Sequence, residues 1–337
     1  QHFESRRSVP SNKVGIFRRF YQEMRLAWDL SCMMKTSLKQ IDGVVITSPP
    51  FFLATHIARL LKKNKVPYIF DIRDRYPNVL FDLNVISEDS FIGRKLSRSE
   101  EKCYKNSVLL SSVTKGIDQE LDSFQKPHAH IPNGFDGKIF DHQKYSKKDS
   151  VFRVVYHGRF SRLHDMESLR EISLRVKELN PNIEFLIIGP IPEYLKNKLW
   201  GNVSFTGEKA RSEVPALLAK GSIGISLMKN MNSTKVAMPA KVYEYIGMGL
   251  PIVVSPEGEL HDFVNRGNIG LAFKKMDISQ IADSLVALEK DQARYKQYQK
   301  QILSIRTKFD RKNQSVVMAD LIEKHFESIE AKKVNLN

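Results

Sequence analysis

Cysteine is scarce in this sequence. Cys32 and Cys103 are the only two in 337 residues, which is too few for a disulfide framework, and they lack the paired spacing of a zinc site. Long apolar runs are missing as well, since stretches such as 185–188 and 250–254 fall far short of the ~20 residues that cross a bilayer. The start of the chain has no secretory pattern of a basic segment, an apolar segment and a small-residue cleavage site. We therefore expect reduced thiols, no transmembrane helix and a cytoplasmic location.

Acidic residues are outnumbered by basic ones. Lysine and arginine together number 53 against 38 aspartate and glutamate, a formal net charge of +15, so the surface should attract nucleic acid, acidic lipid or a phosphorylated substrate. The basic residues are spread along the whole chain, without zinc-finger spacing, an RNA-recognition signature or a basic zipper. This distribution argues against nucleic acid and leaves the other two classes of partner open.

The length predicts two domains, because single hydrophobic cores rarely grow to this size. Short runs rich in Val, Ile and Phe alternate with segments of helical period, which predicts parallel sheets covered by helices and therefore an α/β fold. A polar, lysine-rich stretch at 137–150 separates two such blocks. We predict a first domain at 1–145, a second at 146–310 and a C-terminal helix at 311–337 that packs back towards the first. The expected strands are 44–47, 67–70, 108–113, 129–131, 152–156, 183–188, 203–205, 223–227, 251–254 and 271–273. The expected helices are 52–63, 90–106, 165–179, 213–219, 240–248, 278–289 and a helical tail at 291–333.

The first forty residues do not open with the strand and glycine-rich turn that begin a doubly wound domain. Residues 14–39 instead follow one amphipathic helical pattern, with Phe20, Tyr21, Leu26 and Ala27 among the residues of its apolar side. Two interpretations stay open. The segment is either a core helix with solvated arginines or an interfacial helix that rests on acidic lipid.

Three phrases occur in a fixed order along the chain. Residues 71–77 read DIRDRYP after an apolar strand, residues 156–160 read YHGRF at the end of another, and residues 239–253 read PAKVYEYIGMGLPIV. Together they resemble glycosyltransferase family 4, in particular transferases that build bacterial surface polysaccharides and O-antigen. The resemblance implies retaining sugar transfer and the GT-B fold, which is two doubly wound Rossmann-like domains facing a cleft. The family pattern begins well before this chain does, so we expect the first domain to lack its N-terminal strand, glycine loop and first helix, either because they have been lost or because the sequence is a fragment.

The resemblance also implies a donor site in the second domain. Glu244 matches the family glutamate that accepts hydrogen bonds from ribose hydroxyls, a role that suits an acceptor-only carboxylate. Arg159 matches a phosphate-binding arginine, while Lys241 could supply further positive charge or simply be solvated. Many relatives have a lysine where this chain has His164. The complete implied donor set is Gly158, Arg159, His164, Gly189, Lys209, Ala210, Lys241, Val242 and Glu244.

One family feature is absent. A second glutamate normally precedes Glu244 by eight positions, and here that position is Val236. We expect the loop at 230–238 to contact the donor sugar through backbone groups instead. The loop at 207–210 resembles the one whose backbone reads the base, which favours a UDP-sugar over a GDP-sugar only mildly.

In the first domain, the resemblance makes Asp71, Arg73 and Asp74 the catalytic candidates. No general base stands out, which agrees with front-face retaining transfer in which the leaving phosphate accepts the proton. A structural ion-pair cluster at the strand end is the alternative for these charges. No Asp-x-Asp pair occurs at a strand end in the donor half, so we expect neither a metal ion nor a cofactor.

The expected partners are a nucleotide-sugar donor, a glycan or polyprenyl-linked acceptor and the acidic inner face of a membrane. Two other functions compete with transfer. A non-catalytic nucleotide-sugar-binding partner subunit would bind UDP without turnover. A GT-B epimerase would act on a UDP-sugar and would need acid–base groups, for which His157, His164 and the pair of Asp71 and Asp74 are available.

Overall fold

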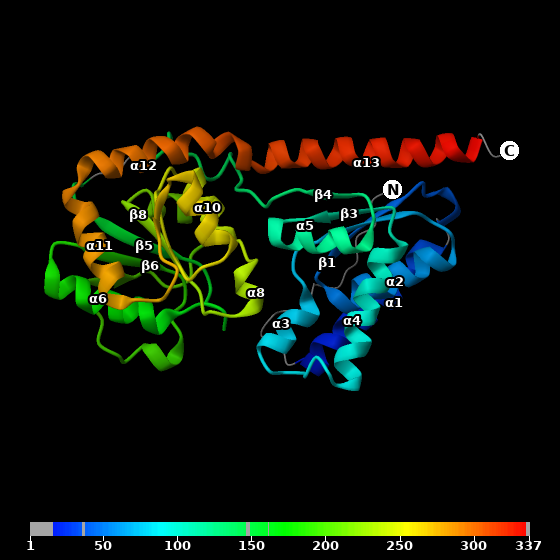
Figure 1. Ribbon diagram of the computed structural model, residues 1–337, viewed down its shortest axis with the longest axis horizontal. Helices are drawn as coiled ribbons and strands as arrows, with labels where there is room; N and C mark the ends of the chain where they lie inside the picture. The colour runs from blue at the N-terminus through cyan, green and yellow to red at the C-terminus, as the bar shows by residue number, and fades with distance from the viewer. Residues whose placement is uncertain (1–15, 36–37, 146–148, 161, 335–337) are drawn as a thin grey trace. The chain divides into compact units, whose positions relative to one another are not determined.

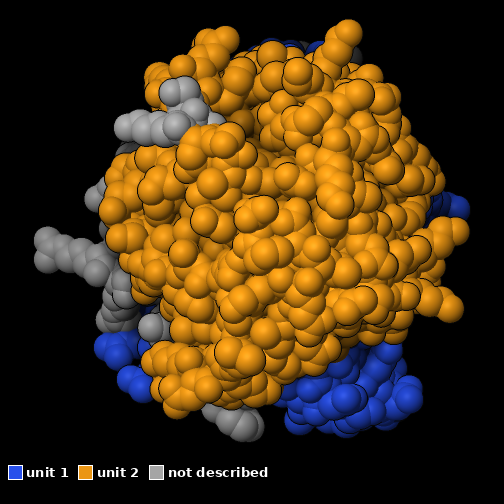
Figure 2. Space-filling model, turned by 90° about the vertical axis from the view of Figure 1, so that its left-hand side faces the viewer, with its two compact units in different colours: residues 1–131, 317–337 blue, residues 132–316 orange. Residues whose placement is uncertain are grey.

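The computed structural model describes residues 16–35, 38–145, 149–160 and 162–334. The chain forms two compact units, one of residues 1–131 with 317–337 and the other of residues 132–316, shown in different colours in Figure 2. The segment 132–145 thus belongs to the second unit, whereas the sequence pattern assigned it to the first domain and placed the boundary between residues 145 and 146. That boundary stays a prediction about domains. We describe each unit by itself.

Unit 1 is built on a four-stranded parallel sheet in the order β1-β2-β3-β4 (Figure 1). Its strands are β1 (Val44–Ser48), β2 (Tyr68–Ile72), β3 (Leu109–Ser112) and β4 (His128–His130). Its helices are α1 (Ile16–Lys35), α2 (Phe51–Lys63), α3 (Tyr76–Asp82), α4 (Phe91–Asn106) and α5 (Lys115–Leu121), with 3-10 turns at Leu38–Gln40 and Asp122–Phe124. Each strand is followed by a helix that returns the chain to the next parallel strand, as such sheets require.

The helix α1 corresponds to the amphipathic pattern at 14–39, of which residues 14–15 and 36–37 lie outside the described residues. Leu26 and Ala27 are buried, as the core interpretation requires, whereas Phe20 and Tyr21 of the same apolar side are 44% and 63% exposed. The core interpretation therefore holds for only part of that side. Glu23 is buried instead, and its Oε2 accepts a hydrogen bond from the N–H of Phe52 at 2.9 Å. A carboxylate at that point satisfies a backbone donor in the first turn of α2, which has no side-chain cap of its own.

Unit 2 contains a six-stranded parallel sheet in the order β10-β9-β8-β5-β6-β7. Its strands are β5 (Arg153–His157), β6 (Glu184–Ile188), β7 (Val203–Phe205), β8 (Ile223–Leu227), β9 (Ile252–Ser255) and β10 (Gly270–Ala272). Its helices are α6 (Met166–Leu179), α7 (Val214–Leu218), α8 (Asn232–Lys235), α9 (Ala240–Gly247), α10 (Glu259–Gly267), α11 (Ile278–Lys290) and α12 (Gln292–Ile305), with 3-10 turns at Glu193–Leu195 and Arg306–Phe309. The chain enters the sheet at β5, builds outward to β7, and then returns to the other side of β5. The order therefore reverses between β5 and β8, the switch point at which doubly wound sheets bind ligands.

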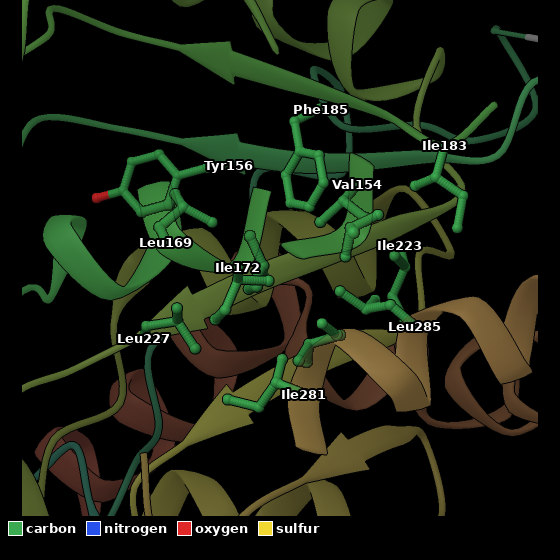
Figure 3. Close-up of a cluster of buried hydrophobic side chains, with 14 of the residues drawn as sticks. Val154, Tyr156, Leu169, Ile172, Ile183, Phe185, Ile223, Leu227, Ile281 and Leu285 are labelled. Carbon is green, nitrogen blue, oxygen red and sulfur yellow. The ribbon is translucent and has the colours of Figure 1, made fainter. Parts of the chain in front are cut away.

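Both faces of this sheet are buried at its inner strands β5, β6, β8 and β9. Val154 and Tyr156 of β5 belong to a hydrophobic cluster with α6 and α11, drawn in Figure 3, whereas Val155 between them belongs to a cluster with α7, α9 and α10. The helices α6 and α11 pack against one another on their side of the sheet (Figure 1). Since successive side chains of a strand point to opposite faces, burial on both sides explains why these strands read as continuous apolar runs.

The last helix, α13 (Arg311–Val334), continues from unit 2 into unit 1. In unit 1 the ring of Phe326 lies against Gly43, where a Cβ would come within 2.1 Å of the ring. A side chain at position 43 would therefore displace the Phe326 ring from this place.

Candidate functional site

Two glycines form the turns that end β5 and β6. Gly158 has a φ of +120° and Gly189 a φ of +140°. Residues other than glycine rarely adopt such backbone angles. The N–H of Gly158 donates to the carbonyl of Ile188 at 2.9 Å, and a Cβ on Gly189 would lie 2.3 Å from the carbonyl oxygen of Gly158. The two turns are therefore held edge to edge at the carboxyl ends of the strands, with Gly189 buried and Gly158 partly exposed.

The loops that follow β5 and β8 meet at the switch point. His164 forms an isolated antiparallel bridge with Met228, and the N–H of Asp165 donates to the carbonyl of Leu227 at 3.2 Å. Asp165 then caps α6, because its side chain accepts from the N–H of Ser168 at 3.0 Å. These contacts place the His164 side chain beside the first turn of α9.

A buried cluster of Lys241, Tyr156 and His164 occupies this position. The Nζ atom of Lys241 donates to the hydroxyl of Tyr156 at 2.7 Å and lies 2.9 Å from Nε2 of His164. Lys241 is only 6% exposed, so the alternative of a solvated lysine is wrong. Burial lowers the pKa of Lys241 to about 7, although the nearby Glu244 carboxylate raises it. Burial, together with the Lys241 charge, lowers the pKa of His164 to about 3. His164 is therefore neutral at ordinary pH, and its Nε2 can accept a hydrogen bond from Lys241.

Glu244 lies one turn further along α9. Residues three apart share a face of a helix, so its carboxylate is on the same side as Lys241. Oε2 of Glu244 is 2.8 Å from Nδ1 of His157, and both side chains are mostly buried, but the geometry is not that of a hydrogen bond. The N–H of His157 donates to the hydroxyl of Tyr245 at 3.0 Å. The carboxylate thus has an acceptor oxygen beside the glycine turn of β5.

The other predicted donor residues are less tightly arranged. Arg159 is exposed and pairs with Glu208, which is also exposed. Ala210 donates its N–H to Oε2 of Glu213 at 2.9 Å, and Nζ of Lys209 lies 3.9 Å from the same side chain. Glu208, Lys209 and Ala210 belong to the exposed loop that follows Gly207, whose φ is +69°.

Val242 presents no side chain to a ligand. It is fully buried in the hydrophobic cluster between the sheet and α9, and its N–H donates to the carbonyl of Pro239 at 3.0 Å. From the same helix, Lys241 and Glu244 direct their polar side chains to the site.

The catalytic candidates belong to unit 1. Asp71 is 2% exposed; its carboxylate accepts from Ser111 Oγ at 2.8 Å, Thr47 Oγ1 at 3.1 Å and Arg73 Nε at 2.7 Å. The ion pair that the sequence left open as an alternative is therefore present at the end of β2. Asp74 is exposed and does not take part in these bonds.

Tyr156 and Tyr245 contact residues of the candidate site, and sequence reasoning did not place either of them there. Tyr156 supports the Lys241 ammonium and Tyr245 supports the backbone of His157. Their aromatic rings are buried among core residues, so the sequence signal is that of ordinary apolar positions. Tyr156 and His157 do precede Gly158 directly, and proximity to that glycine turn was the available clue.

The described residues contain no group of three or more His, Cys, Asp or Glu side chains placed to hold a metal ion. None of the described helices combines the length and the apolar character that crossing a bilayer demands.

Comparison with known proteins agrees with this geometry. Residues 151–291 match the family model of glycosyl transferases group 1. The fold is similar to Anabaena Alr3699/HepE solved in complex with UDP, with a TM-score of 0.68, 12% identity, and coverage of 90% of this chain and 82% of that one. It is also similar to sucrose-phosphate synthase from Thermosynechococcus elongatus, with a TM-score of 0.69, 14% identity, and coverage of 94% and 81%. A search of curated protein sequences finds no match.

These findings confirm the GT-B fold that the sequence predicted. With the family match in unit 2, they identify the chain as a glycosyltransferase of GT-B architecture.

Proposed function

We propose that the protein is a retaining, metal-independent glycosyltransferase that uses a UDP-sugar. Its acceptor would be a glycan or a polyprenyl-linked sugar in the synthesis of surface polysaccharide, at the acidic inner face of a membrane. The observation that carries the proposal is the gathering of Gly158, Lys241 and Glu244 at the switch point of unit 2. Anabaena HepE, which shares the fold, was solved with UDP and with UDP-glucose, and this supports the choice of donor.

Each group has a role that follows from its chemistry. The Glu244 carboxylate accepts hydrogen bonds from two ribose hydroxyls. The partly exposed turn at Gly158 lets the diphosphate approach the backbone, and the N-terminus of α9 supplies the positive end of a helix dipole. Lys241, once protonated, neutralises charge that develops on the leaving diphosphate. No side chain is then needed as a general base, because the leaving phosphate accepts the proton of the acceptor.

The loop at 230–238 is the proposed contact with the donor sugar. Thr234 Oγ1 accepts from the N–H of Met231 at 3.0 Å and donates to the carbonyl of Lys229 at 2.6 Å. Its side chain therefore closes the loop on itself, and the sugar would be read by backbone groups where relatives use a glutamate in place of Val236.

The histidines of unit 2 favour transfer over epimerisation. An epimerase would need acid–base groups, but His164 is buried against Lys241, and His157 lies against Glu244. Both imidazoles therefore contact proposed donor-binding residues, a position that does not suit the acid–base groups of an epimerase.

The test is isothermal titration of the full chain with UDP and with GDP, in the presence of a chelator. UDP should bind, and Glu244→Ala should weaken binding by ~1–3 kcal/mol because ribose hydroxyls lose their acceptor. Glu178→Ala is the matched control, since Glu178 is an exposed carboxylate on α6 and should have no effect. Binding of neither nucleotide by folded protein would refute the donor site. Binding without turnover of any UDP-sugar would favour the non-catalytic subunit.

A further inference from the structure

The outer face of α4 carries cations and large apolar side chains together. Phe91 and Ile92 in its first turn are 75% and 57% exposed, although such side chains normally gain free energy from burial. Phe91, Lys95 and Arg98 follow at intervals of four and three residues, and Lys102 continues the line. Residues at these intervals lie on one side of a helix. This face of α4 is therefore apolar at its N-terminal end and basic along the rest of the helix.

This line borders a hollow between α4 and α2, two helices labelled in Figure 1. Five cations line the hollow, namely Arg59 from α2 and Arg94, Lys95, Arg98 and Lys102 from α4. Nη2 of Arg59 reaches across to donate to Ser99 Oγ at 3.0 Å.

The described carboxylates leave this charge uncompensated. None of them lies within ion-pair distance of the five cations, and Glu101, on the same helix, is paired with Lys105 at 3.3 Å. Glu100 is buried against Arg75 at 2.9 Å. Five like charges in one hollow repel one another and attract an anionic partner.

An anionic bilayer would satisfy both parts of the face. A soluble phosphorylated ligand would neutralise the charge of the cations but would leave Phe91 and Ile92 exposed to water. The geometry points to docking of this face on an anionic phospholipid surface, with Phe91 and Ile92 inserted at the acyl boundary and the cations of the hollow against headgroup phosphates. The inference rests on the membrane contact in the proposed function and names the surface that makes it.

Helix α1 offers the competing surface. Arg18, Tyr21, Arg25 and Trp28 are exposed and follow one another at intervals of three, four and three residues. This side of α1 has two described cations against five in the hollow. The electrostatic attraction to acidic lipid, ~1 kcal/mol for each basic residue near the surface, therefore favours the face of α4.

The experiment is co-sedimentation of the full chain with vesicles of mixed phosphatidylglycerol and phosphatidylcholine, and with phosphatidylcholine alone. Wild type should bind only the anionic vesicles, and Arg98→Glu/Lys102→Glu should weaken binding by about tenfold or more. Phe91→Ala/Ile92→Ala should also weaken it, at unchanged charge. The control is Lys296→Glu/Lys300→Glu, which makes the same charge change at the same spacing on the exposed side of α12 and should bind nearly as wild type does.

Three results would overturn the inference. They are an equal loss in the control, a loss confined to Arg18→Glu/Arg25→Glu, and a failure of wild type to bind anionic vesicles. Displacement by inorganic phosphate, at an ionic strength matched with chloride, would also overturn it by assigning the hollow to a soluble anion. All variants should keep the wild-type affinity for UDP. A protein that binds vesicles but not UDP would refute the donor site and leave this inference standing.

Discussion

Nζ of Lys241 lies 2.9 Å from Nε2 of His164 in unit 2, beside the carboxyl ends of the inner strands β5 and β8. The two residues are 77 positions apart in the chain, and the bridge between His164 and Met228 brings them together. An ammonium beside an imidazole is stable only while the imidazole is neutral, because both would otherwise be cations in a poorly solvated place. The pair therefore links the donor site to pH in two separate windows.

The first window is acidic and belongs to His164. Its pKa in the folded protein is lowered to about 3, from an ordinary value of 6.5. Between these values the unfolded chain binds a proton that the folded protein does not, so the free energy of unfolding falls as pH falls below 6.5. We expect wild type to lose stability relative to His164→Gln, by at most about 1.4 kcal/mol for each pH unit. Urea unfolding at several pH values measures this, and the difference between the two proteins should be constant above pH 7. Parallel curves throughout would contradict the burial of a neutral His164.

The second window concerns Lys241 and nucleotide binding. Its pKa is lowered to about 7, so the free protein has a largely neutral amine at about pH 8, whereas a bound diphosphate favours the ammonium. Binding of UDP should therefore take up as much as one proton there, and affinity should fall as pH rises above 7. Calorimetry in two buffers of different ionisation enthalpy measures the uptake. Lys241→Met should bind UDP more weakly and without uptake. Identical heats in both buffers for wild type would show that Lys241 does not meet the phosphates.

The sequence was most informative where both faces of a strand are buried. The strand Ile223–Leu227, in which all five residues are buried, has the bounds that were predicted, because a mainly apolar run between turns leaves little choice of register. Several short helices were missed, although α7 (Val214–Leu218) was predicted at 213–219. In α5 only Ile117 and Leu121 are buried, and two apolar positions one turn apart are too few to establish a helical period.

The candidate site divides in the same way. Gly158 and Glu244 could be predicted because a glycine turn and a carboxylate on a helix before a Gly-x-Pro turn are local patterns. The burial of Lys241 could not, since it depends on Tyr156 and His164, which reach it only through the packing of β5 and β8. Long-range contacts of this kind have no local sequence pattern.

The glycine turns differ in what they tolerate. A Cβ on Gly189 would meet the carbonyl oxygen of Gly158 at 2.3 Å, whereas a Cβ on Gly207 would have nothing within 4 Å. Both have positive φ and would be strained by alanine. Gly189→Ala should therefore lower the free energy of unfolding by about 3 kcal/mol or more, from clash and strain together. Gly207→Ala should cost about 1 kcal/mol, from strain alone. Urea unfolding compares the two variants directly. Equal losses in the free energy of unfolding would show that backbone strain, and not the clash with the Gly158 carbonyl, sets the cost of alanine at position 189.

Asp71 and Asp74 were proposed together as catalytic residues, and the structure gives a way to separate them. Asp71 is buried and accepts from Ser111, Thr47 and Arg73, so Asp71→Ala leaves three donors without their acceptor. We expect it to lower the free energy of unfolding by about 1–3 kcal/mol, the range for leaving buried hydrogen-bond donors unsatisfied. Asp74→Ala, at an exposed position, should change it by less than about 0.5 kcal/mol. Urea unfolding followed by sugar-transfer assays distinguishes the roles. A stable Asp71→Ala protein that binds UDP but transfers no sugar would make Asp71 a catalytic residue, because a carboxylate that only holds β2 to its neighbours cannot be removed without loss of stability.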